Sequence, residues 1–112
     1  MQKTITNVWI EGKQNNIDLS FLGIDGYKII NEECHKFNGY KYERIFRSIT
    51  EKSLYNSLTN KEIVDCSKLI KKFLDGVKKN KSQIESFSLE EAENFQHMLE
   101  VYGESGCQLH SW

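Results

Sequence analysis

Hydrophobic and polar residues alternate along much of the first half of the chain, and a period of two predicts β-strands. Residues 4–10 are rich in β-branched and aromatic side chains, and a turn-rich stretch follows at residues 12–16. Residues 17–21 alternate in the same way, and residues 27–37 form a third extended run. With a further strand expected after these, the first half predicts an antiparallel meander of about four strands.

The Asn38-Gly39 dipeptide is the strongest local signal for a β-hairpin. Both residues tolerate the positive φ angles of a type I′ turn, whose twist matches that of the flanking strands. A two-residue loop here sets favourable cross-strand pairs on one side of the hairpin: Phe37 with Tyr40, His35 with Tyr42 and Glu33 with Arg44. The predicted hairpin thereby gathers aromatic, imidazole and guanidinium groups on one surface.

The second half of the chain predicts two amphipathic helices, each starting with a capping box. Thr59 precedes Glu62, and Ser88 precedes Glu91, at the spacing where each side chain meets the other residue's backbone N–H. Behind each box the apolar residues recur at the spacing of a buried helix face: Ile63, Cys66, Ile70, Phe73 and Val77 in the first, and Leu89, Ala92, Phe95, Leu99 and Tyr102 in the second.

Strands followed by helices in separate blocks indicate the α+β class. We expect a single domain over residues 1–112, since this length lies near the common domain size. The two C-terminal helices are expected to pack on one face of the N-terminal meander. Residues 106–112 are expected to add a short final strand.

Composition places the protein among folded domains, with 38% hydrophobic residues and a net charge of −1. The odd number of cysteines, three, argues against a secreted disulfide framework. The opening residues hold no apolar run typical of a signal peptide or membrane anchor, so we expect a cytoplasmic protein. Ile, Lys and Asn, whose codons are rich in A and T, supply 33 residues, which indicates a low-GC bacterium or one of its phages.

The near-neutral net charge hides a segregation of charge between the two predicted helices. Residues 61–81 contain seven lysines and three acidic residues, whereas residues 82–112 contain six glutamates and no lysine or arginine. The acidic helix carries polar residues along one side, which we call the acidic stripe: Glu90, Glu93, His97, Glu100 and Glu104. Such a stripe either faces the basic helix or steers the protein onto a basic partner.

Signals for catalysis or metal binding are weak. Cys107 and His110 have a spacing found in zinc sites, and Cys34-His35 is a second pair, but in strands such residues point to opposite faces. No family-type context marks a cysteine as a nucleophile, and Cys66 lies on an apolar stripe. A near-neutral chain with two arginines and no phosphate-binding glycine loop argues against nucleic-acid binding. We therefore expect no metal and no cofactor.

The first functional hypothesis is a small intracellular protein that inhibits a partner protein by occupying it. Proteins of this type include immunity proteins for bacterial toxins and phage-encoded inhibitors of host systems. The acidic stripe would make the contact, and the partner would carry a basic surface.

The alternative is a homo-oligomer that binds or sequesters a nucleotide-like small molecule. Its aromatic faces and anion-binding donors would come from the predicted hairpin: His35, Tyr40, Tyr42 and Arg44. A small enzyme is a third hypothesis, for which the sequence places no nucleophile or base. No membrane partner is expected.

Overall fold

The computed structural model describes residues 7–13, 17–80 and 88–111, and its class is α+β, as the sequence predicts. In chain order the elements are β1 (Asn7–Glu11), the short 3-10 helix η1 (Ser20–Leu22), β2 (Lys28–Asn31), β3 (Cys34–Asn38), α1 (Gly39–Thr50), α2 (Asn60–Asn80), α3 (Leu89–Glu104) and β4 (Gln108–Ser111). Residues 4–6 of the predicted first strand and residue 112 of the predicted last one lie outside the described residues.

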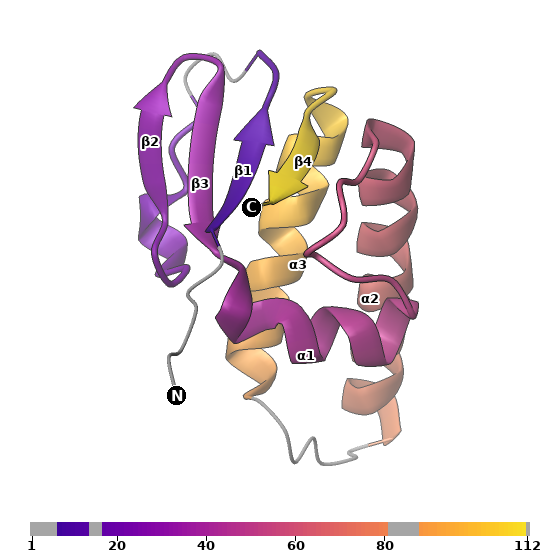
Figure 1. Ribbon diagram of the computed structural model, residues 1–112. Coiled ribbons are helices and arrows are strands. Elements are labelled where there is room, and N and C mark those ends of the chain that lie inside the picture. Colours follow the sequence, from indigo (N-terminus) through magenta and orange to yellow (C-terminus); the bar gives the residue numbers. More distant parts are fainter. Residues whose placement is uncertain (1–6, 14–16, 81–87, 112) are drawn as a thin grey trace, which may run out of the picture.

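The strands of the described residues form one antiparallel sheet in the order β2-β3-β1-β4 (Figure 1). β1 lies between β3 and β4, and at its middle Trp9 lies opposite Lys36 of β3 and His110 of β4. The predicted N-terminal meander of about four strands is wrong in two respects: β1 pairs with β3 instead of β2, and three strands, not four, precede the helices in the described residues. The C-terminal strand completes the sheet beside β1, so the sheet joins the two ends of the chain.

One face of the sheet is covered and the other is open. In Figure 1, α3 lies behind the sheet, α2 stands beside α3, and α1 crosses the lower end of the sheet. Alternate strand residues point to the covered face and have exposed fractions of 0–1%: Val8, Ile10, His35, Phe37 and Leu109. Trp9 and Lys36, which alternate with them, lie on the open face and are half-buried.

The centre of the core is an aromatic cluster around Phe95 of α3. The Phe95 ring stacks on the Tyr42 ring of α1, with centroids 4.9 Å apart and an angle of 8° between the planes. Phe37 of β3 and Phe46 of α1 meet the Phe95 ring edge-on at 6.0 and 6.3 Å. Aromatic pairs of this kind contribute about 0.5–1.5 kcal/mol each beyond their buried area. Phe95 therefore packs the sheet, α1 and α3 together.

The predicted hairpin at Asn38-Gly39 is wrong, because Asn38 begins a helix. Its side chain accepts a hydrogen bond from the backbone N–H of Tyr40 at 3.1 Å and thereby caps α1. Asn is favoured in turns and at helix N-caps alike. The apolar residues after it recur at helical spacing: Tyr42, Ile45, Phe46 and Ile49. The cross-strand pairs predicted for Tyr40, Tyr42 and Arg44 therefore do not form.

The hairpin that the sheet does contain joins β2 to β3 through residues 32–33. There the Asn31 side chain accepts a hydrogen bond from the Glu33 N–H at 2.8 Å, as in an Asx turn. The strand predicted over residues 17–21 is also wrong, because this segment leads into η1. Phe21, which the alternation places on the apolar face of that strand, is 75% exposed.

Both capping boxes are confirmed at the starts of α2 and α3. The Glu62 N–H donates to Thr59 Oγ1 at 3.2 Å, and the Glu91 N–H donates to Ser88 Oγ at 3.0 Å. The buried stripe predicted for α2 is wrong at Phe73, which is 42% exposed. The starts of the two long helices are therefore fixed by side chains close to them in the sequence.

Tyr27, His35 and Tyr102 form a polar cluster between the sheet and α3. His35 Nδ1 lies 2.6 Å from the Tyr102 hydroxyl oxygen, which lies 2.7 Å from that of Tyr27. Burial lowers the pKa of His35, because a charged imidazole would lose its water shell there. Burial also raises the pKa of Tyr102. The imidazole and the phenol are therefore both neutral in the folded chain at neutral pH.

We expect the free energy of unfolding to fall as the pH drops from about 7 to about 5. The unfolded chain binds a proton at His35 near the usual imidazole pKa of about 6.5, whereas the folded chain binds it only at lower pH. The stability linked to His35 is complete above that value and is lost below it, with a slope of at most about 1.4 kcal/mol per pH unit. Urea unfolding of wild type and His35→Gln at several pH values measures this slope.

The control for this experiment is His97→Gln, since His97 is exposed on α3. This variant should keep the slope of the wild type, whereas His35→Gln should lose it. Equal slopes in the wild type and His35→Gln would contradict a neutral, buried His35.

Candidate functional site

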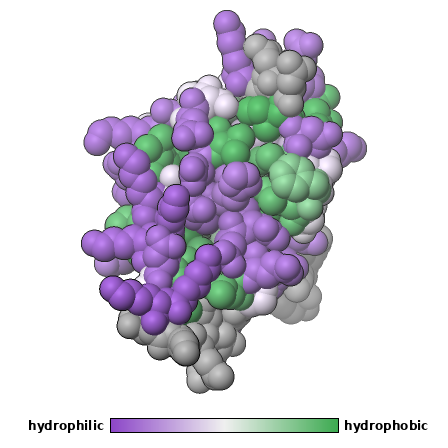
Figure 2. Space-filling view, turned by 180° about the vertical axis from the view of Figure 1, so that it is seen from behind, coloured by the Kyte–Doolittle hydropathy of each residue, from purple (hydrophilic) through white to green (hydrophobic). Residues whose placement is uncertain are grey.

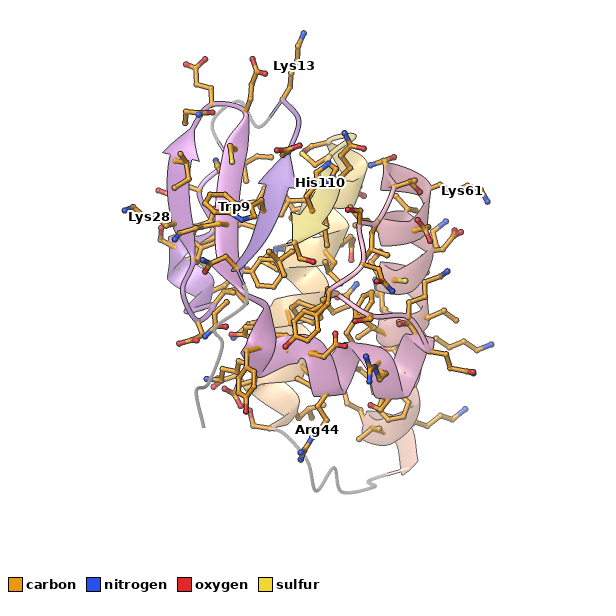
Figure 3. All side chains as sticks on the ribbon, viewed as in Figure 1. Trp9, Lys13, Lys28, Arg44, Lys61 and His110 are labelled. Carbon is orange, nitrogen blue, oxygen red and sulfur yellow. The ribbon has the colours of Figure 1, made fainter. Side chains whose placement is uncertain are left out.

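A hollow of about 690 Å³ lies beside α1, between this helix and the segment that leads to α2. The residues that line it define the α1 groove: Tyr40, Lys41, Glu43, Arg44, Ile45, Arg47, Ser48 and Tyr55. Figure 3 shows Arg44 projecting from α1 away from the sheet. α1 turns its apolar side to Phe95, so Tyr40, Lys41, Arg44, Arg47 and Ser48 are exposed on the side that faces solvent, whereas Ile45 is buried.

Both arginines of the chain lie in the α1 groove. They are three positions apart, so their side chains lie on one face of α1. Arg47 is 66% exposed and pairs with Glu43 at 3.0 Å. Lys41 Nζ lies 2.7 Å from Glu91 Oε2 of α3, and this ion pair lowers the pKa of Glu91. Arg44 is exposed and makes no ion pair within the described residues, so its guanidinium faces solvent.

Glu43 holds in place the segment around Tyr55, which forms the side of the α1 groove opposite α1. Its carboxylate accepts hydrogen bonds from Ser53 Oγ at 2.6 Å and from the Leu54 N–H at 2.8 Å. The Glu43 side chain is only 12% exposed, so these bonds are shielded from water. In the same segment, the Tyr55 carbonyl accepts a hydrogen bond from Ser111 Oγ at 2.5 Å. These hydrogen bonds therefore hold Tyr55 beside α1 and define the shape of the α1 groove.

Tyr40 and Tyr55 add aromatic rings to the arginines, with exposed fractions of 50% and 37%. Tyrosine and arginine are enriched among the residues that dominate protein–protein binding energy. A guanidinium also binds a carboxylate or phosphate through two parallel hydrogen bonds. The arrangement therefore suits the binding of a partner or ligand that carries negative charge.

The structure offers little for nucleophilic catalysis by a thiol. The α1 groove contains no cysteine or histidine. Burial raises the pKa of Cys34, Cys66 and Cys107, so each thiol stays protonated at neutral pH. Cys66 and Cys107 are also closed off from solvent in the core.

The structure divides the predicted ligand-binding residues between two places. Tyr40 and Arg44 lie together in the α1 groove. Tyr42 is buried, and its hydroxyl accepts a hydrogen bond from the Asp25 N–H at 2.8 Å. His35 lies in the core with an exposed fraction of 1%. Arg47 was not predicted as a site residue, because in a strand Arg44 and Arg47 point to opposite faces. Tyr55, which lies outside α1, was not predicted either.

The acidic stripe lies along α3, beside the lysines of α2. Glu93 Oε2 lies 2.5 Å from Lys78 Nζ, and Glu100 accepts a hydrogen bond from Gln96 Nε2 at 2.9 Å. Glu100 and Glu104 also line a hollow of about 220 Å³ together with lysines of α2. Part of the segregated charge therefore cancels between the two neighbouring helices.

Three residues of the acidic stripe are still exposed on α3: Glu90, His97 and Glu104. Figure 2 views the molecule from the side of α3, where hydrophilic residues cover much of the surface with hydrophobic areas between them. The stripe is therefore a second candidate contact surface, although fewer of its charges are available than the sequence suggests.

The open face of the sheet carries charges that mostly pair with neighbours. Lys36 Nζ lies 5.3 Å from the centre of the Trp9 ring, a cation–π distance. His110, labelled with Trp9 in Figure 3, has its Nε2 atom 3.1 Å from Glu11 Oε1 and its Nδ1 atom 3.2 Å from Ser57 Oγ. This face is therefore a weaker candidate than the α1 groove.

Three further findings bear on function. In the described part of the chain, no group of three or more His, Cys, Asp and Glu side chains is placed to hold a metal ion. Over the same residues, no helix is long and apolar enough to cross a membrane. No family model, curated protein or solved structure matches the chain. Function must therefore be inferred from the side chains of the molecule itself.

Replacing Glu43 should destabilise the fold, whereas replacing Arg44 should not. Glu43→Ala leaves the Leu54 N–H and the Ser53 hydroxyl without their acceptor, which costs about 1–3 kcal/mol of unfolding free energy. Arg44→Ala changes an exposed side chain, and the expected change is within about 0.5 kcal/mol. Urea unfolding measures both variants. A loss for Arg44→Ala as large as that for Glu43→Ala would contradict the assignment of Arg44 as an exposed, non-structural residue.

Proposed function

We propose that this protein binds a partner protein in the cytoplasm and inhibits it by occupying its surface, and that the α1 groove makes the contact. One observation carries this proposal: both arginines of the chain and two partly exposed tyrosines gather around one hollow. Tyrosine and arginine present large contact areas and several hydrogen-bonding groups from few side chains.

An acidic surface on the partner fits the α1 groove best. Arg44 faces solvent without an ion pair among the described residues, and Arg47 is 66% exposed. Carboxylates or phosphates on the partner would bind both guanidinium groups. This proposal differs from the expectation of a basic partner that docks on the acidic stripe. It is preferred because Glu93 and Glu100 already have partners within the chain, whereas Arg44 has no ion pair among the described residues and Arg47, although paired with Glu43, stays 66% exposed.

The biological role that we propose is that of an immunity-protein-like or phage-encoded inhibitor. The composition rich in Ile, Lys and Asn supports it. Inhibition of this kind requires only a surface that fits the partner, with no catalytic group, and the α1 groove would supply that surface.

A nucleotide-like ligand is the second candidate, and the same hollow favours it. Its volume of about 690 Å³ lies within the usual range of small-molecule sites, about 300–1,000 Å³. Tyr40 would offer a ring for stacking and Arg44 a donor for phosphate. His35 and Tyr42 no longer belong to this site, because both are buried in the core.

Affinity capture from a lysate of a low-GC bacterium tests the proposed function. Wild type should retain one protein in stoichiometric amount, and Arg44→Glu/Arg47→Glu should lose at least about 90% of it, since reversing two contact charges repels an acidic partner. The matched control is Lys61→Glu/Lys72→Glu, which reverses two exposed charges on α2. This control should retain the partner as wild type does.

Three outcomes would contradict this assignment. Equal retention by wild type and Arg44→Glu/Arg47→Glu would exclude the α1 groove as the contact surface. Loss of the partner only in Glu90→Lys/Glu93→Lys/Glu100→Lys would move the contact to the acidic stripe. A column that retains no protein, together with thermal stabilisation of the chain by a nucleotide panel, would favour the small-molecule alternative.

A further inference from the structure

Residues 17–27 precede β2 and pack on the covered face of the sheet, beside α3. In Figure 1 this segment, drawn in purple, runs behind β2 and β3. Leu19 and Ile24 are buried, with exposed fractions of 6% and 5%, whereas Phe21 between them is 75% exposed. We call residues 17–22, which include η1, the strap.

The strap is held to the fold more weakly than the residues that follow it. Asp25 is tied to the start of α1, because its carbonyl accepts a hydrogen bond from the Asn38 N–H at 2.9 Å and its carboxylate accepts one from Asn38 Nδ2 at 2.7 Å. Within the described residues, the strap makes one hydrogen bond beyond Gly23: the Leu19 N–H donates to the Tyr27 hydroxyl at 3.0 Å. Gly23, which joins the two parts, has a φ of 67°, and the space that a Cβ would occupy there is open.

The Tyr27 hydroxyl belongs to the polar cluster with His35 and Tyr102, and this membership fixes the direction of its hydrogen bonds. A backbone N–H can only donate, so the Leu19 N–H and the two hydroxyls bring three hydrogens to the cluster. The Tyr27 oxygen accepts from Leu19. The Tyr102 oxygen then accepts from Tyr27 at 2.7 Å, and His35 Nδ1 accepts from Tyr102 at 2.6 Å. His35 Nδ1 is therefore unprotonated, and the neutral imidazole carries its hydrogen on Nε2.

A proton on His35 Nδ1 would add a fourth hydrogen to the cluster and remove one of its acceptors. A hydroxyl hydrogen of Tyr27 or Tyr102 would then lack an acceptor, which is costly in a buried cluster. If the Leu19 N–H leaves, the Tyr27 hydroxyl can donate to water instead. We propose that this cluster is an acid-sensitive latch: protonation of His35 releases the strap, which moves away from the sheet by rotation at Gly23 while the rest of the chain stays folded.

The surroundings of His35 set the pH at which the latch opens. The strand residues opposite it, Ile10 and Ile29, are apolar. The titratable groups around the cluster come from the strap, from the residue before β2 and from α3 and the residues after it: Asp18, Tyr27, Tyr102 and Cys107. The Asp18 charge raises the pKa of His35, but Asp18 is exposed, and burial of the imidazole lowers this pKa more strongly. The latch is therefore closed at neutral pH and opens as the pH falls below the usual imidazole pKa of about 6.5.

Amide hydrogen exchange of the purified chain at pH 7 and pH 5 tests the latch. After correction for intrinsic exchange rates, the protection factor of the Leu19 amide should fall about tenfold between the two pH values. At pH 5 it should also lie at least about tenfold below that of the Phe95 amide, because only global unfolding exposes that part of α3.

Two histidine variants separate the latch from other effects of pH. In His35→Gln the Leu19 amide should be equally protected at both pH values, because the Gln side-chain oxygen can accept from Tyr102 and does not titrate. The matched control is His97→Gln, which replaces an exposed histidine of α3 and should keep the fall seen in wild type. The inference does not rest on the proposed inhibitor function, since no strap residue lines the α1 groove.

The ring ¹⁵N chemical shifts of His35 test the direction of the hydrogen bonds without any substitution. At pH 7, Nδ1 should have the shift of an unprotonated nitrogen and Nε2 that of a protonated one. The inference is overturned by a proton on Nδ1 at pH 7, by protection of the Leu19 amide that does not change with pH, or by equal protection of the Leu19 and Phe95 amides at pH 5. A fall that persists in His35→Gln would overturn it as well.

Discussion

The packing of the Phe95 ring determines how the rest of the molecule is arranged. This ring stacks on Tyr42 and meets Phe37 edge-on, so one side chain of α3 contacts both α1 and β3. Removing a buried phenylalanine of this kind costs about 3–5 kcal/mol, a large part of the stability of a small domain. Because Tyr42 must face Phe95, the opposite side of α1 must face solvent. Tyr40, Arg44 and Arg47 are exposed for that reason.

The surfaces of the molecule follow from this one-sided burial. α3 covers one face of the sheet, so the other face and the edge at β2 stay open. α2 packs along α3, and this packing brings the basic helix beside the acidic one. The ion pair of Lys78 with Glu93 is one consequence, and the hollow shared by Glu100 and the lysines of α2 is another. Part of the uneven charge along the sequence is therefore neutralised between neighbouring helices.

The sequence predicts the parts of this fold that depend on local signals. The two capping boxes fix the starts of α2 and α3, and the class follows from the separation of strands and helices. α1 could not be predicted so directly, because Asn38-Gly39 suits a hairpin turn and a helix start equally well. In the folded chain, residues 39–50 form a helix, and Tyr42 of this helix packs on Phe95, which is distant in sequence. The site was predicted in part for the same reason. Tyr40 and Arg44 were expected together on a strand, but only a helix places Arg47 on the same face as these two residues.

We propose that the solvent-facing side of α1 is the binding surface of this protein. The most direct measurement is a ¹H–¹⁵N correlation spectrum of the labelled chain, titrated with the purified partner that wild type retains from the lysate. The account predicts that shifts and line broadening concentrate in residues 40–48 and 53–56, around the α1 groove. Changes confined to residues 90–104, with α1 unaffected, would contradict it and place the contact on the acidic stripe.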